Sequence, residues 1–320
     1  MSLFYPVEKL ADWVLSFTPL SLDNVLYGAI HFFIYDSVKI GLLLVTIIFV
    51  ITFIRSYLPA QKIRRMLSSR FSIVGNILAS LLGVITPFCS CSAVPLFIGL
   101  LEAGVPLGVT FSYLVSAPMV NEIAVVLLFG MFGWKVALLY VISGILLAII
   151  AGVIFGKMKL EHLVEEYVWE FKSEGEELEE RLTVKQRLFT SYYYTKDLVK
   201  KIFPYILIGV ALGAVIHGYL PEGFLSTYAS ASNPFAVIIV VLIGIPLYSN
   251  AAGTIPIVRS FVEKGLPMGT ALAFMMSVTA LSLPEMIILR NVLKPKLLAL
   301  YFSVVGLGII LTGYLFNIVL

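Results

Sequence analysis

Apolar residues fill long blocks of the chain, and polar residues are confined to the segments between them. Residues 40–54 read IGLLLVTIIFVITFI, and residues 136–156 and 297–320 are similarly apolar. Each block is about as long as an α-helix must be to cross the hydrocarbon core of a bilayer. Overall, 60% of the residues are hydrophobic and 13% are charged. This pattern predicts an all-α polytopic membrane protein.

The chain repeats itself at a spacing of 161 residues. The stretch IGLLEAGVPLGVTFSYLVS at 98–116 resembles VRSFVEKGLPMGTALAFMMS at 258–277. Such internal similarity indicates a duplicated structural unit. Identical residues recur at this spacing in the pairs Asp36 and Asp197, Lys39 and Lys200, Pro95 and Pro256, Glu102 and Glu263, Gly104 and Gly265, Pro106 and Pro267, Gly108 and Gly269, and Ser116 and Ser277.

The repeat divides the chain into four predicted parts. Residues 36–156 and 197–320 form two transmembrane repeats, residues 1–35 an N-terminal amphipathic segment, and residues 157–196 a charged connector. The loop at 55–70 contains five basic residues and no acidic residue. By the positive-inside rule this loop lies in the cytoplasm, and we expect the connector and the basic loop before the last apolar block on the same side.

We expect the turn near residue 132 outside the cell. Between the cytoplasmic residue 70 and this external turn the chain must cross the membrane an odd number of times, although residues 71–130 contain two apolar stretches. We therefore predict re-entrant, broken helical hairpins at 71–103 and 234–264. The predicted spans are 38–55, 106–129 and 135–156 in the first repeat and 202–219, 266–289 and 297–319 in the second. Two inverted structural repeats, each with three transmembrane helices and a broken hairpin, are typical of transporters. Eight full crossings with parallel repeats remain the alternative.

The first hairpin turns at the sequence TPFCSCS. Pro87 removes a backbone donor and interrupts the helix, and the hydroxyl groups of Ser90 and Ser92 can satisfy freed backbone groups or contact a solute. Cys89 and Cys91 carry soft sulfur atoms that suit a metalloid or a sulfur-containing solute. The alternative is that both thiols are small packing groups. No His or further Cys completes a zinc shell, so no metal site and no cofactor are predicted.

The second hairpin turns at GIPLYSNAAGT and contains no thiol. Tyr248, Ser249 and Asn250 occupy the equivalent position, so we expect one soft wall and one hydrogen-bonding wall at the site. An amide within hydrocarbon costs free energy unless it is paired, which makes Asn250 the strongest of these candidates. Helix capping is the alternative role for Asn250.

Two carboxylates lie within predicted spans. The segments SAPMVNE and SVTALSLPE each place a Ser, a Pro and then a Glu in order, ending at Glu122 and Glu285. An ionised carboxylate at mid-membrane costs about 2.5–3.5 kcal/mol on insertion scales, so both are candidates for coupling transport to protons or cations. Asn121 is a candidate polar neighbour. A structural ion pair or a position at a helix end is the alternative for each carboxylate.

Several of these motifs resemble one known family. PFCSCSAVPLFIGLLEAGVPLG, SYLVSAPMVNE and PLYSNAAGTIPIVRSFVEKGLPMG are similar to the ArsP/YraQ-type predicted permease family, and the resemblance extends from about residue 36 to the end. It implies a permease of the bacterial or archaeal inner membrane. Known members export trivalent organoarsenicals, and the thiols of Cys89 and Cys91 suit that chemistry.

The sequence therefore predicts a secondary transporter for a small soft or sulfur-bearing solute, with a trivalent organoarsenical as one candidate. Its expected partners are the small-molecule or metalloid solute, membrane lipid and a second copy of the chain, but no nucleic acid. We find no phosphate-binding loop and no nucleophile elbow, which argues against an enzyme. A thiol-dependent redox or sulfur-handling membrane protein and a channel of the same fold are the alternatives.

Overall fold

In the computed structural model of the chain, helices joined by turns and short irregular segments make up the described part, with one isolated β-bridge between Val164 and Leu293. The prediction of an all-α chain is confirmed. The structure describes residues 5–16, 25–55, 72–86, 90–166, 168, 183–219, 233–247, 251–263 and 265–320.

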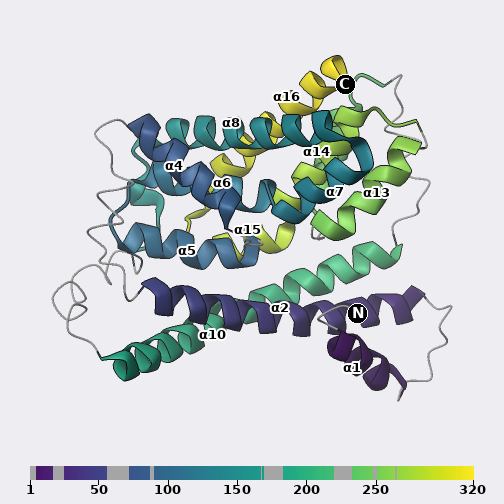
Figure 1. The fold of residues 1–320 in the computed structure, drawn as a ribbon. Coiled ribbons are helices and arrows are strands. Elements are labelled where there is room, and N and C mark those ends of the chain that lie inside the picture. Colours follow the sequence, from purple (N-terminus) through teal and green to yellow (C-terminus); the bar gives the residue numbers. More distant parts are fainter. Residues whose placement is uncertain are drawn as a thin grey trace.

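Figure 1 shows that α1, α2 and α10 form a layer on one side of the remaining helices. The helices of the first half are α1 (Tyr5–Ser16), α2 (Val25–Arg55), α4 (Ser72–Ile85), α5 (Ser90–Glu102), α6 (Leu107–Met119), α7 (Glu122–Phe132) and α8 (Trp134–Met158). After a short 3₁₀ turn, η1 (Glu161–Leu163), the second half contains α10 (Val184–Tyr219), α12 (Ala236–Gly244), α13 (Ala251–Glu263), α14 (Met268–Ala280), α15 (Leu283–Leu289) and α16 (Pro295–Val319).

The helix bounds recur at the spacing found in the sequence. The helices α5, α6 and α8 have the same bounds as α13, α14 and α16 once 161 residues are added. The turns between them also match, because Gly104 and Gly265 have φ angles of 74° and 88°. In both turns the glycine closes a Schellman motif in which the next residue donates back to the carbonyl group five positions earlier. We call residues 161 positions apart counterparts.

Helices lie on both sides of each predicted hairpin tip. The helix α4 ends at Ile85 and α5 begins at Ser90, while α12 ends at Gly244 and α13 begins at Ala251. Both tips therefore separate two short helices.

Each half contains a second interruption that the sequence analysis missed. The predicted spans 106–129 and 266–289 are each interrupted, because the helices end at Met119 and Ala280 and new ones begin within three residues. The segments on either side of the first break are bent by 48°. In the second, Ser282 takes the N-cap position and a proline stands in the first turn of α15, which is a common way for a helix to begin.

Three helical segments of the described residues are long and apolar enough to cross a membrane: Trp134–Met158, Met268–Leu289 taken through its break, and Pro295–Val319. The bent pair Leu107–Met119 and Ala124–Phe132 makes a fourth if it is counted as one span. This supports a membrane protein.

The helices α2 and α10 are longer than their predicted spans. They begin at Val25 and Val184 rather than at 38 and 202, and the predicted boundary between the connector and the second repeat falls inside α10. The two helices lie side by side and run in opposite directions (Figure 1). They approach closely where a Cβ atom on Gly41 would lie 3.0 Å from Cε2 of Phe203.

Small residues allow α6 and α8 to pack closely. Gly144, Ala148, Gly152 and Gly156 follow one another at four-residue spacing along α8, as in many membrane helix interfaces. A Cβ atom on Gly108 of α6 would lie 2.7 Å from Cα of Gly156 and would also meet the Gly152 carbonyl group. The α6–α8 contact therefore requires glycine on both helices.

Replacing Gly108 by alanine should destabilise the protein by about 1–3 kcal/mol, because the new methyl group meets backbone atoms that cannot rotate away. Gly130→Ala is the matched control, since Gly130 is also helical but has nothing within 4 Å of its Cβ position. We expect the control to gain up to about 1 kcal/mol from helix propensity. Thermal unfolding of the two variants in detergent measures the difference, and equal unfolding temperatures would contradict the close packing.

The beginning of the connector is attached to the loop before α16. The backbone N–H group of Lys294 donates to the Leu163 carbonyl group at 2.8 Å, and that of Glu165 donates to Val292 at 2.9 Å. Arg290 and Glu165 form an ion pair at 3.4 Å. We call residues 161–166 the strap. Because the strap and the loop were both expected in the cytoplasm, their contact agrees with the charge distribution.

Candidate functional site

Most of the predicted site residues belong to the two hairpin tips, which fall largely outside the described ranges. Five predicted site residues lie outside the described ranges: Pro87, Cys89, Tyr248, Ser249 and Asn250. Ser90, Cys91 and Ser92 form the first turn of α5, but the structure describes only their backbone. The roles of these side chains therefore remain predictions.

In the second half, the hairpin tip and the helix break are adjacent. The backbone N–H group of Leu283, the first residue of α15, donates to the carbonyl group of Ile245 at the end of α12, at 2.9 Å. A Cβ atom on Gly244 would meet the hydroxyl group of Ser277. The first half has the counterpart approach, in which Gly83 of α4 faces Ser116 of α6, with the Ala117 nitrogen 3.0 Å from its Cβ position. Each tip thus begins close to the broken helix of its own half.

The two halves contact each other through counterpart elements. The helix α5 contacts α15 and α13 contacts α7, so the helix after each tip packs on the helix after the other half's break. The helices α6 and α14 are also in contact, as are α8 and α16. A Cβ atom on Gly308 would meet the side chain of Leu147, its own counterpart. Counterpart residues of the two halves therefore meet directly at the α8–α16 contact.

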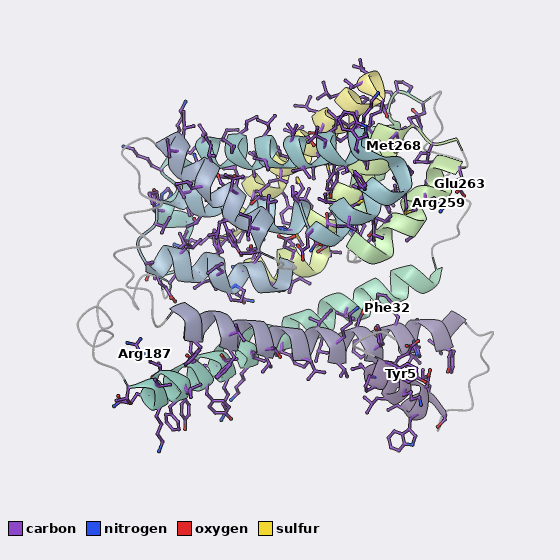
Figure 2. All side chains as sticks on the ribbon, viewed as in Figure 1. Tyr5, Phe32, Arg187, Arg259, Glu263 and Met268 are labelled. Carbon is purple, nitrogen blue, oxygen red and sulfur yellow. The ribbon has the colours of Figure 1, made fainter. Side chains whose placement is uncertain are left out.

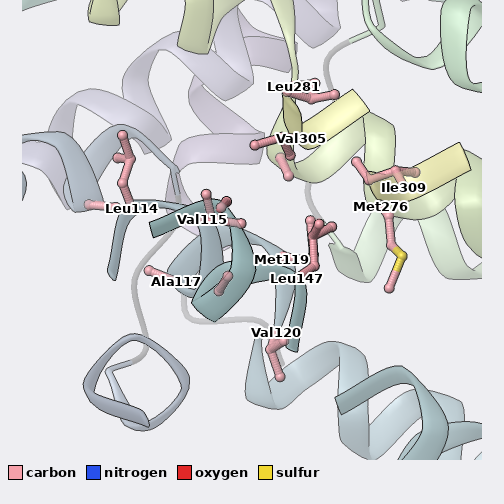
Figure 3. Packing of buried hydrophobic residues seen from close by; sticks show 14 of the residues in the cluster. Leu114, Val115, Ala117, Met119, Val120, Leu147, Met276, Leu281, Val305 and Ile309 are labelled. Atoms are coloured by element: carbon pink, nitrogen blue, oxygen red, sulfur yellow. The ribbon is translucent and has the colours of Figure 1, made fainter. Parts of the chain in front are cut away.

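Buried apolar side chains fill the region where the broken helices meet. Figure 3 shows Met119 and Val120 at the end of α6, Leu147 of α8, and Leu281 and Val305 from the second half. All five are buried. The helix breaks are therefore enclosed by protein, which is the condition under which irregular backbone is tolerated at membrane depth.

Of the three predicted coupling residues, Glu285 is the one that is deeply buried. Its exposed fraction is 1%, and it is the only buried Asp or Glu among the residues that the structure describes. The Tyr301 phenol lies beside it and interacts electrostatically with the carboxylate. Glu122 is exposed in the first turn of α7, and Asn121 is half-buried at the break. The two carboxylates, which the sequence pattern presents as equivalent, therefore have different environments in the structure.

Two counterpart tyrosines face the breaks and were not among the predicted site residues. Tyr140 is fully buried, and its hydroxyl group donates to the Met119 carbonyl group at 2.6 Å. Tyr301 is also fully buried; its ring lies 5.7 Å from that of Phe111 at a tilt of 32°, in addition to its contact with Glu285. One tyrosine thus satisfies a carbonyl group freed by the first break, and the other contacts the acid after the second. The 161-residue spacing between the two tyrosines was the feature of the sequence that could have identified them.

No metal cluster accompanies the buried carboxylate. Within the described ranges, no group of three or more His, Cys, Asp or Glu side chains is arranged to hold a metal ion. What the described site offers is one buried carboxylate, phenol and hydroxyl groups, and backbone freed at two helix breaks.

Comparisons with known proteins point to one family. The model of ArsP_1, described as "Predicted permease", matches residues 25–318. UPF0718 protein MJ0584 of Methanocaldococcus jannaschii is 22% identical over 85% of this chain and 92% of its own length. UPF0718 protein YraQ of Escherichia coli is 25% identical over 90% of this chain and 79% of its own. A Streptococcus mutans protein, named as a two-component membrane permease complex subunit, is 22% identical over 81% of each chain. No solved structure matches.

Proposed function

Because the chain belongs to the predicted permease family ArsP_1, we propose that it is a multi-pass secondary transporter of the inner membrane. Its two repeats have opposite orientations, and its solute site lies near the membrane midplane between the two hairpin tips. The observation that supports this most directly is the exchange of contacts between the halves, with α5 on α15 and α13 on α7. These contacts bring two interrupted segments of each half together, as in transporters built from inverted repeats.

The directions of the helices favour inverted over parallel repeats. The counterparts α2 and α10 pack side by side in opposite directions, and α8 and α16 also run in opposite directions in this view (Figure 1). A two-fold axis that reverses membrane helices must lie perpendicular to them, in the plane of the membrane. The same inversion follows from the positive-inside distribution of the loops.

The proposed solute is a small soft or sulfur-bearing molecule, with trivalent organoarsenicals as one class. Cys89 and Cys91 supply soft ligands in this proposal, because thiolates favour soft atoms. Ser90, Ser92 and Pro87 shape the same tip, and Tyr248, Ser249 and Asn250 provide the opposite, hydrogen-bonding wall. Glu285 carries the coupling proton or cation, with Asn121 and Glu122 near the other break.

A second subunit is part of the proposal. The Streptococcus mutans relative is named as a subunit of a two-component complex, and a partner chain or a second copy would cover part of the apolar surface here. Purification from native membranes under mild detergent, followed by mass measurement of the intact complex, tests this point. A mass of a single 35.3 kDa chain would argue against it.

The transport proposal is tested by solute binding and flux. We expect methylarsenite to raise the unfolding temperature of the purified protein, because a ligand at 100 times its dissociation constant adds about 2.7 kcal/mol to the stability of the folded state. Arsenite, thiosulfate, sulfite and divalent metals serve as comparison ligands. In proteoliposomes, uptake that saturates and follows a proton gradient supports a carrier. Flux that remains linear with concentration and ignores the gradient would support a channel.

A further inference from the structure

Four lysines and two aspartates lie near the middle of α2 and α10. They are Asp36, Lys39, Lys196, Asp197, Lys200 and Lys201. The sequence pattern alone places Asp36 and Lys39 at the start of an apolar span. In the structure, however, α2 continues from Val25 to Arg55 and α10 from Val184 to Tyr219, so these charges lie well inside both helices.

The depth of these charges follows from the two-fold relation. The helices α2 and α10 cross where Gly41 faces Phe203, and α8 and α16 meet at the counterparts Leu147 and Gly308. Each contact is near the middle of its helices. In an inverted repeat these crossing points lie on the two-fold axis. That axis runs within the midplane of the membrane, so both crossing points are at the midplane.

Helix geometry then gives the distance of each charge from the midplane. At 1.5 Å per residue, positions 36 and 39 lie roughly 8 and 3 Å from Gly41 along the axis of α2. Positions 196, 197 and 200 lie roughly 11, 9 and 5 Å from Phe203 along α10. All are within the roughly 15 Å half-thickness of the hydrocarbon core.

None of these five charged side chains is buried within the chain, so each must also contact lipid, water or another molecule. Lys196, Asp197 and Lys200 are exposed, and Asp36 and Lys39 are half-buried. A charged side chain facing lipid at this depth costs about 2.5–3.5 kcal/mol even on insertion scales, so intramembrane charges normally face a wet or polar pathway. By contrast, Val45 of α2 and Ile208 of α10, at similar distances from the crossing, are exposed and apolar, as expected for a lipid-facing surface.

We propose that Lys39 and Lys200, with their charged neighbours on α2 and α10, line a water-filled part of the translocation pathway that attracts an anionic solute. The five charged side chains that the structure describes here, three lysines and two aspartates, sum to a net positive charge of one. Positive clefts bounded by low-dielectric walls raise the local concentration of anions. This inference rests on the proposed inverted-repeat transporter and favours the anionic candidates for its solute, such as thiosulfate and sulfite, over methylarsenite, which is uncharged at neutral pH.

Cysteine labelling tests the pathway without a known solute. In a Cys89→Ser/Cys91→Ser background reconstituted in liposomes, Lys39→Cys and Lys200→Cys should react with the membrane-impermeant anionic reagent MTSES. Val45→Cys and Ile208→Cys are the depth-matched controls and should stay unlabelled. A cationic reagent of the same size should react roughly tenfold more slowly than MTSES at the two lysine positions.

Two outcomes would overturn the inference. If both lysine positions are as unreactive as the controls, the charges do not face water. If they react faster with the cationic reagent, the pathway does not favour anions. Proton-driven uptake of methylarsenite by liposomes that contain the wild-type protein distinguishes these results from a failure of the transporter proposal, because wild-type carrier activity together with unlabelled lysine positions would leave that proposal intact. Unfolding temperatures show whether each variant is folded.

Discussion

Glu285→Gln is expected to abolish proton-driven uptake of methylarsenite into proteoliposomes while leaving the protein folded. Glutamine preserves the size of the side chain and its capacity for hydrogen bonds, but it cannot carry a negative charge or exchange a proton at neutral pH. Because Glu285 is 1% exposed and lies beside Tyr301, its charge state acts directly on buried groups at the second helix break. We expect gradient-driven uptake to fall by roughly 100-fold, near the upper end of the coupling found between linked sites.

A second flux measurement separates coupling from general damage. Exchange of labelled for unlabelled methylarsenite across the same liposomes needs no proton gradient, and it should continue in Glu285→Gln. The matched control is Glu263→Gln, because Glu263 is exposed on α13 and pairs with Arg259 at 2.7 Å (Figure 2). It should retain both activities. Normal gradient-driven uptake by Glu285→Gln would assign the carboxylate a purely structural role.

The Cys89→Ser/Cys91→Ser variant should lose the stabilisation that methylarsenite gives to the wild-type protein. Serine is close to cysteine in size, so the unfolding temperature without solute should change little. Its hydroxyl group is a hard ligand and does not bind trivalent arsenic as a thiolate does. The expected loss is the whole ligand-induced increase in unfolding temperature, which corresponds to about 2.7 kcal/mol at 100 times the dissociation constant.

The single variants Cys89→Ser and Cys91→Ser refine this result. If both thiols contact the arsenic atom, each single variant should retain part of the stabilisation. If one thiol only packs against its neighbours, its replacement should leave the binding of methylarsenite unchanged. Full stabilisation of the double variant would remove the thiols from the site and leave the hydroxyl and amide groups of the tips as the remaining candidates.

The sequence predicts much of this fold because the duplication is visible in residues that determine local structure. Gly104 and Gly265 require a left-handed conformation, and Pro106 and Pro267 precede the next helix in the same extended conformation. Such residues determine where helices end and begin whatever surrounds them. The ends of α5 and α13 and the starts of α6 and α14 follow from this pattern.

The second pair of helix breaks was missed because hydropathy does not distinguish a continuous apolar helix from a broken one. The helices on either side of Val120 together remain apolar enough for a membrane span despite Asn121 and Glu122. The break is stabilised by Tyr140, whose hydroxyl group donates to the carbonyl group of Met119, 21 residues earlier. A tertiary contact of this kind cannot be read from a local pattern. The sequence Ser282–Leu283–Pro284 was a usable local signal, since it resembles the start of a helix.

The candidate site shows a similar division between local and tertiary information. Proline and serine near the tips predict where helices end, and α4 and α12 do end just before the two tips. The different environments of Glu122 and Glu285 depend on which helices pack around them, so sequence alone treated the two acids as equivalent. The extent of α2 was misjudged for a related reason: Asp36 and Lys39 have the composition of a loop, but they lie inside a helix whose partner is α10.

The strap has a consequence for the order in which the newly made chain can fold. Glu165 and its ion-pair partner Arg290 are 125 residues apart, and Val164 is buried where it pairs with Leu293. At typical translation rates, roughly 6 to 25 seconds pass between the synthesis of the two sides. During that interval the strap has no docking surface. The strap therefore cannot reach its final structure until the ribosome has nearly finished the second repeat.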